Sequence, residues 1–114
     1  MSRSDRPLVD IAWLCVASVA EEVVFRGVLQ PWLAKRFGRR LSAARLTPAN
    51  LLTSAVFAAL HAWRHPVAVA AGVFPVSLVY GIARERSGSV VPPALLHAGF
   101  NVLLYAASWL VGPR

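Results

Sequence analysis

Three charged side chains stand within a largely apolar stretch near the start of this chain. Glu21, Glu22 and Arg26 fall inside the run from Leu8 to Leu33. Hydrocarbon solvates ionised groups poorly, so charged residues in such a run must face a protein interior or a wet cavity. This constraint favours a helix bundle with a polar centre, and it makes the three charges the first candidates for function.

The composition indicates a membrane protein. Of the 114 residues, 57% are hydrophobic, an excess that a soluble domain of this size would have to expose to water. The net charge of +7 could indicate nucleic-acid binding, but the basic residues cluster in short connections between apolar runs. That placement is typical of membrane topology and of contact with anionic lipid head groups. We therefore expect the lipid bilayer, and no nucleic acid, as a partner.

The apolar segments predict an all-α fold, a polytopic membrane bundle of about four short helices. Thr47 and Pro48 form a start signal, a side-chain cap followed by proline at the first helical position. Pro31 is expected to bend the first helix and Pro75 to kink the third. The length suits a single domain over residues 1–114. The expected spans are residues 8–37, 48–63, 66–84 and 92–111.

The basic residues are unequally divided between the two sides of this bundle. One side holds Lys35, Arg36, Arg39, Arg40, Arg45, Arg84 and Arg86. The other side holds Arg3, Arg6, Arg64 and Arg114. The positive-inside rule then predicts that the basic connections 35–45 and 84–86 are cytoplasmic and that both chain ends lie outside. We expect the protein in the cell membrane of a prokaryote.

Polar groups on three separate helices are expected at a similar depth. Measured from the basic side at 1.5 Å per residue, Glu21, His61 and Asn101 lie roughly 18 to 21 Å into the membrane. His97 lies about one helical turn shallower. Packing alone does not explain such residues, since apolar side chains would fill the space without a desolvation penalty. The sequence therefore predicts that they build one site.

The spacing within each motif predicts which side chains face one another. Residues four apart lie on one helix face, so Glu22 can reach Arg26 and His97 can lie above Asn101. Glu21 projects about 100° away from Glu22. We infer that Arg26 neutralises Glu22, which leaves Glu21 to face the two histidines as a general base.

These motifs resemble the signature of the CPBP family, the CAAX protease and bacteriocin-processing intramembrane proteases, also called the Abi family. A turn similar to the family's precedes the last motif at residues 81–89, and the resemblance covers about residues 17–105. Many family members have further helices before the first motif, so we expect a homo-oligomer or a partner subunit to complete this small bundle. The matching residues are Glu21–Glu22, Arg26–Gly27, Phe57, His61, His97 and Asn101.

The resemblance implies an intramembrane endopeptidase that hydrolyses a peptide bond of a membrane-associated protein or peptide. In the family's scheme Glu21 activates a water molecule and His61 helps to hold it. His97 and Asn101 stabilise the oxyanion, a role in which preorganised donors contribute strongly. No metal and no cofactor is expected. The pair that would support the site structurally is Glu22 and Arg26.

Three other interpretations stay open. Glu21, His61 and His97 match the residue types of a catalytic zinc site, although the chain has no His-Glu-x-x-His stretch. A non-enzymatic immunity or assembly protein could retain the same fold. A proton-coupled or ion-coupled carrier could use the same groups as a relay, but four short spans without an inverted repeat disfavour it.

Overall fold

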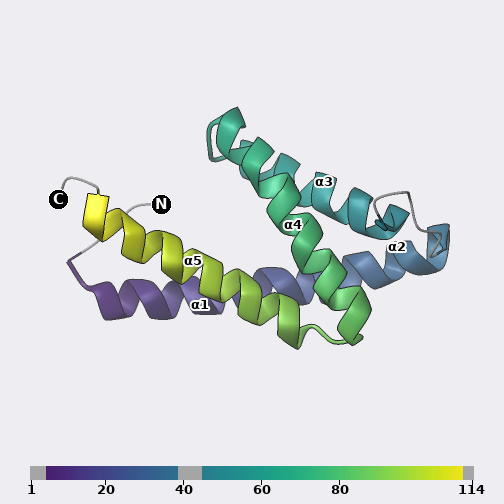
Figure 1. Cartoon of the computed structure of the whole chain (residues 1–114), viewed down its shortest axis with the longest axis horizontal. Coiled ribbons are helices and arrows are strands. Elements are labelled where there is room, and N and C mark those ends of the chain that lie inside the picture. The colour runs from purple at the N-terminus through teal and green to yellow at the C-terminus, as the bar shows by residue number, and fades with distance from the viewer. Residues whose placement is uncertain (1–4, 39–44, 112–114) are drawn as a thin grey trace.

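The structure is a computed structural model that describes residues 5–38 and 45–111. These residues form helices and no strand, which confirms the predicted all-α fold (Figure 1). Each predicted span agrees with the observed helices to within three residues at either end. The elements are α1 (Pro7–Val24), η1 (Phe25–Leu29), α2 (Gln30–Phe37), α3 (Pro48–Ala62), α4 (Val67–Ser87) and α5 (Val91–Val111).

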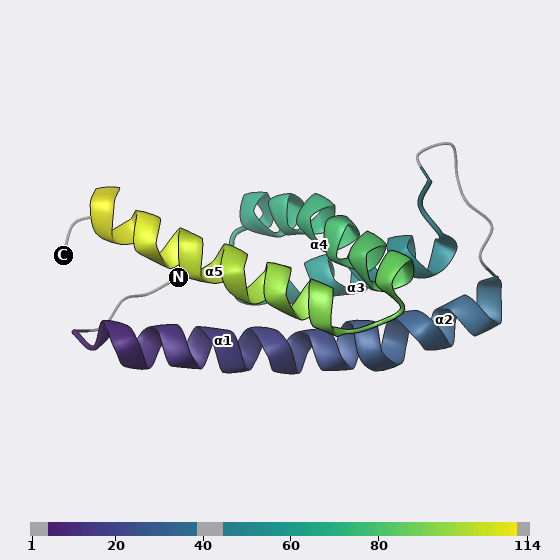
Figure 2. The same cartoon turned by 60° about the horizontal axis from the view of Figure 1, so that its bottom comes forward.

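The longer helices form two pairs, α1 with α5 and α3 with α4. Helix α5 packs along α1, and α4 packs along α3. Helix α4 also packs against α5, and α2 packs against α3, so that each pair is joined to the other (Figure 1). The start of α1 and the end of α5 lie at one end of the long axis, with α2 at the other end (Figure 2). The residues that we predicted as one site lie on three helices: Glu21 on α1, His61 on α3, and His97 and Asn101 on α5.

The first three elements form one continuous rod. At 1.5 Å per residue, the stretch from Pro7 to Phe37 is about 46 Å long, which matches the longest dimension of the molecule, 47 Å. The chain keeps helical dihedral angles at Val24, Phe25 and Gln30, where the helix type changes. A five-residue π-helical segment, η1, lies directly before α2 and ends two residues before Pro31.

The described part of the chain buries polar side chains and turns apolar ones outward. Its buried set holds ten polar or charged residues against seven hydrophobic ones. Large apolar side chains are exposed on the outer surfaces, for example Val67 at 77% and Leu103 at 66%. This distribution suits a lipid environment, where burial of apolar surface does not drive helices together. Two helices, α4 and α5, are long and apolar enough to cross a membrane.

Described residues beside the two predicted cytoplasmic connections contact one another. Thr47, which precedes α3, donates to Glu85 near the end of α4, so these two helix ends are on the same side of the bundle. Their assignment to the cytoplasm stays a prediction. The residues of the orientation argument that lie outside the described part of the chain are Arg3, Arg39, Arg40 and Arg114.

Helices α3 and α4 approach closely at Gly81. Asn50 donates from Nδ2 to the carbonyl oxygen of Leu78 at 3.0 Å, and its Oδ1 accepts from Ser54 Oγ at 3.1 Å. A Cβ atom built on Gly81 would lie 1.9 Å from Asn50 Oδ1. Because Asn50 is fully buried, the absence of a side chain at position 81 is what admits this polar contact.

We predict that Gly81→Ala lowers the free energy of unfolding by about 2 kcal/mol, because the new methyl group must displace Asn50 or push the helices apart. The control is Gly72→Ala in the same helix, since a Cβ there meets nothing within 4 Å. That substitution should be neutral or stabilising by up to about 1 kcal/mol, from helix propensity alone. Thermal unfolding in detergent micelles measures both, and equal effects would contradict the packing argument.

Candidate active site

His97 of α5 lies at the centre of a polar cluster. Its Nδ1 atom is 2.8 Å from Glu22 Oε2, and its Nε2 atom is 3.5 Å from Glu21 Oε1. The Glu22 carboxylate is an acceptor, so the short contact favours a proton on Nδ1 of the imidazole. The histidine is 4% exposed. One buried imidazole thus lies between two carboxylates of α1.

The two carboxylates differ in their access to the surroundings. The Glu22 side chain is 0% exposed and pairs with Arg26 Nε at 3.5 Å, whereas the Glu21 side chain is 43% exposed. Neighbouring residues on a helix point about 100° apart, which turns one carboxylate inward and leaves the other at the edge. The predicted pair of Glu22 and Arg26 is present, and Glu22 is in addition the closer partner of His97.

Arg26 connects η1 to α4 and to the aromatic side chains of the bundle. Its Nη2 atom donates to both the carbonyl oxygen and the hydroxyl oxygen of Ser77. Its guanidinium carbon lies 5.3 Å from the centroid of the Phe57 ring and 5.8 Å from that of Tyr80. Aromatic faces attract such a cation, and buried charges need partners of this kind. Arg26 therefore holds Glu22 and α4 in fixed relation.

Pro31 follows η1 and leaves one of its carbonyl groups without a backbone donor. Proline has no N–H, and the N–H of Gln30 donates to the carbonyl of Phe25, five residues back. In this register the carbonyl of Arg26 would accept from position 31, where no donor exists. Arg84 of α4 supplies the missing donor, with its Nε atom 2.8 Å from the Arg26 carbonyl oxygen. The turn that carries Arg26 is thus completed by a side chain from another helix.

The Phe57 ring lies between the two histidines that we predicted as site residues. Its centroid is 4.5 Å from that of His61 and 5.7 Å from that of His97. His61 is half-buried, and its Nδ1 atom is 2.7 Å from the Phe57 carbonyl oxygen. That bond leaves Nε2 of His61 for other partners. The structure thus brings His61 to the cluster through a shared aromatic ring.

Asn101 lies one helical turn beyond His97 along the interface of α1 and α5. Its Nδ2 atom donates to Ser18 Oγ at 2.9 Å, and Ser18 donates in turn to the carbonyl oxygen of Leu14 at 2.6 Å. Farther along the same interface, Tyr105 donates to Asp10 Oδ2 at 2.6 Å. Polar pairs therefore follow one another along these two helices.

Sequence reasoning missed three residues that contact the predicted site. Ser18 lies four residues before Glu22, so the rule that residues four apart share a face could have found it. Ser77 and Tyr80 of α4 gave no signal, because serine and tyrosine without a charged neighbour are ordinary constituents of membrane helices. The structure adds them by bringing α4 against η1 and α5.

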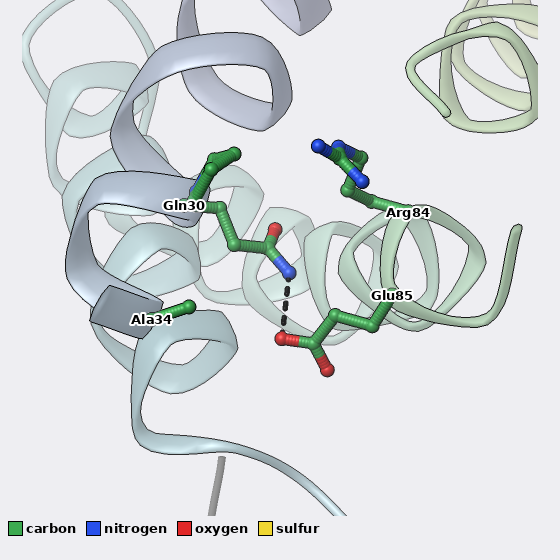
Figure 3. Close-up of a pocket in the computed structure, with 5 residues that line it drawn as sticks. Gln30, Ala34, Arg84 and Glu85 are labelled. Carbon is green, nitrogen blue, oxygen red and sulfur yellow. Dashed lines mark hydrogen bonds between the residues drawn. The ribbon is translucent and has the colours of Figure 1, made fainter. Parts of the chain in front are cut away.

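A second polar cluster lies at the end of α4 and does not include His97. Gln30 donates from Nε2 to the Gly81 carbonyl at 3.1 Å and to Glu85 Oε2 at 3.0 Å, and Thr47 donates to the same Glu85 oxygen. Figure 3 shows the small pocket beside these residues, which has a volume of about 20 Å³, room for about one water molecule. Glu85 thus joins α2, the start of α3 and α4. The pocket is lined by Gln30, Pro31, Ala34, Arg84 and Glu85.

The zinc interpretation gains no support from the arrangement of donors. Over residues 5–38 and 45–111, no three His, Cys, Asp or Glu side chains are grouped so that they could hold one metal ion. Both ring nitrogens of His97 face carboxylates, and Nδ1 of His61 faces a backbone carbonyl. Glu21, His61 and His97 therefore do not form a metal-binding set in this geometry.

Residues 5–103 match the family described as type II CAAX prenyl endopeptidase Rce1-like. The chain belongs to this family. The resemblance that we inferred from the three motifs is thereby confirmed, and membership together with helices α4 and α5 indicates a membrane protein.

The chain is similar to an Escherichia coli protein that is named "Uncharacterized 24.3 kDa protein". It is 32% identical over 82 residues, which cover 72% of the present chain and 36% of the relative. The chain thus spans about a third of the length of that relative. No solved structure gives a significant match.

We predict that Arg84→Met destabilises the protein by about 1 to 3 kcal/mol, because it leaves the buried carbonyl of Arg26 without a donor. The same substitution should cost clearly less in a Pro31→Ala background, where the N–H of Ala at position 31 can take over. Thermal unfolding of the two single variants and the double variant forms a double-mutant cycle. Strictly additive effects would contradict the proposed exchange of donors.

Proposed function

We propose that this chain is an intramembrane endopeptidase that hydrolyses a peptide bond of a membrane-associated protein or peptide. One observation carries the proposal. A half-exposed carboxylate, Glu21, lies 3.5 Å from Nε2 of the buried His97, whose other nitrogen is held by Glu22. An accessible base beside a fixed imidazole is what activation of a water molecule requires. Membership of a family described as endopeptidases supports this choice of reaction.

In the proposed reaction Glu21 takes a proton from a water molecule, whose oxygen attacks the carbonyl carbon of the substrate. The carbonyl π bond opens, and its electron pair forms an oxyanion. When the tetrahedral intermediate collapses, the C–N bond breaks and the nitrogen takes the proton that Glu21 has held. A carboxylate can serve as base and then as acid in this way because it returns to its starting state.

Two donors are proposed to stabilise the oxyanion. His97 would donate through Nε2 when that nitrogen carries a proton, while Nδ1 stays bonded to Glu22. The Asn101 amide carries two hydrogens, and the bond to Ser18 uses one of them and fixes the amide. Donors that are held in place before the charge develops stabilise it most.

His61 is proposed to hold the attacking water. A proton on Nδ1, bonded to the Phe57 carbonyl, leaves Nε2 as an acceptor. The Phe57 ring sets the spacing of this histidine from His97. Glu22 and Arg26 then serve as structural support, because both are fully buried and paired.

We further propose that residues 17–105 carry the site within a single domain over residues 1–114. Because the family is described as CAAX prenyl endopeptidases, prenylated CAAX proteins are the substrate class that we propose to test first. We place the protein in the cell membrane with connections 35–45 and 84–86 in the cytoplasm, following the positive-inside rule. A second copy of the chain or a partner subunit would complete the small bundle.

We predict that Glu21→Gln lowers kcat by about 100-fold or more, because it removes the base and keeps the shape. The thermal unfolding temperature should hardly change, since this side chain is 43% exposed. Cleavage of a membrane-anchored, fluorescence-quenched peptide by the protein in liposomes measures kcat, and mass spectrometry identifies the bond that is cut.

Two controls accompany this variant. Asp5→Asn removes an exposed carboxylate away from the cluster and should leave cleavage unchanged. Glu22→Gln makes the same chemical change as Glu21→Gln at the buried neighbour, and it should lower the unfolding temperature because it leaves Arg26 without its paired charge. Undiminished cleavage by Glu21→Gln would show that Glu21 is not the base.

A further inference from the structure

Tyr80 of α4 lies flat against the imidazole of His97. The two ring centroids are 5.0 Å apart, and the planes differ by 19°. Tyr80 is 3% exposed, and the guanidinium carbon of Arg26 lies 5.8 Å from the centroid of its ring. The proposed reaction does not use this side chain directly, although it contacts the histidine at the centre of the cluster.

The contacts of His97 show what the Tyr80 ring restricts. Glu22 holds Nδ1 and Glu21 lies near Nε2, so both carboxylates act at the edge of the imidazole. Phe57 meets the imidazole at 79°, an edge-to-face contact. Tyr80 is nearly parallel to the imidazole and covers its face. Rotation of the imidazole about its Cβ–Cγ bond would swing both nitrogens away from the carboxylates and would drive the ring into Tyr80.

Helix α4 contacts both Arg26 and His97, through Ser77 and Tyr80. Ser77 and Tyr80 are three residues apart and therefore share a helix face. Ser77 accepts from Arg26 on η1, while Tyr80 stacks on His97 of α5. Helix α4 thus sets the side chains of the other two elements relative to one another.

We propose that Tyr80 is a positioning residue of the site. Its ring fixes the plane of the His97 imidazole, so that Nδ1 faces Glu22 and Nε2 faces Glu21 at the same time. The aromatic face carries this role, and the hydroxyl group is not needed for it. The catalytic consequence rests on the proposed function, whereas the orientation of His97 can be measured whether or not the protein cleaves a peptide.

The test compares Tyr80→Phe, which keeps the ring, with Tyr80→Leu, which removes it. Tyr105→Leu is the matched control. Tyr105 is 2% exposed and contacts Asp10 and Trp109, and it lies in α5 away from His97. The first measurement is kcat and KM on the membrane-anchored peptide. The second is ¹⁵N NMR of histidine-labelled protein in micelles. The chain has three histidines, so His61→Gln and His65→Gln assign the signals.

We expect Tyr80→Phe to keep kcat within about twofold and to leave the ¹⁵N shifts of His97 unchanged. Tyr80→Leu should lower kcat about tenfold with KM unchanged, since a stacked pair contributes on this scale. Its His97 Nδ1 signal should move toward that of the exposed His65, as the bond to Glu22 becomes intermittent. Tyr105→Leu should lower the unfolding temperature by a similar amount and change neither kcat nor the His97 signals.

The proposal is overturned if the His97 signals of Tyr80→Leu equal those of the unmodified protein, or if Tyr80→Phe is impaired as strongly as Tyr80→Leu. The latter result would assign the role to the hydroxyl group. If Tyr80→Leu does not accumulate, Tyr80→Met removes the ring with a longer side chain, and the same two outcomes apply. If the unmodified protein cleaves no peptide, the proposed function fails by itself, and the NMR comparison still decides the role of Tyr80.

Discussion

The fully buried carboxylate of Glu22 on α1 is the group on which the packing of three other elements depends. It pairs with Arg26 of η1 at 3.5 Å and with His97 of α5 at 2.8 Å, and Arg26 continues to Ser77 of α4. In lipid, apolar surfaces give helices little reason to associate. A buried charge that loses its partner costs about 3 to 5 kcal/mol. Polar contacts therefore hold these helices together, and breaking any one of them leaves a buried charge without its partner.

The same logic governs the backbone. Within a membrane each peptide group needs a partner inside the protein. Pro31 removes one donor, η1 shifts the register, and Arg84 supplies the donor that the carbonyl of Arg26 then lacks. Also in α4, Gly81 makes room for the buried amide of Asn50. Local departures from ideal helices are thus compensated by side chains of neighbouring helices, which also fixes how the helices pack.

The helices could be predicted from the sequence because apolar runs and proline signals act locally. The pair of Glu22 and Arg26 followed from spacing within one helix. Successive side chains on a helix point about 100° apart. Whether Glu21 or Glu22 lies closer to His97 therefore depends on the rotation of each helix about its axis, which the spacing of residues along the chain does not give. Spacing could not show that Glu22 is the nearer, nor that uncharged Tyr80 covers the imidazole, because both depend on how α4 and α5 turn about their axes.

Adjacent carboxylates acquire different environments here through helix geometry. One residue step turns Glu22 into the interior, where it has two partners, and leaves Glu21 at the edge with a side chain that is 43% exposed. Chemically identical groups perform different tasks when their environments differ. Glu22 holds the Nδ1 edge of His97 and pairs with Arg26, while Glu21 lies beside Nε2 of the same imidazole. The placement of His97 beside the accessible carboxylate therefore depends on the buried one.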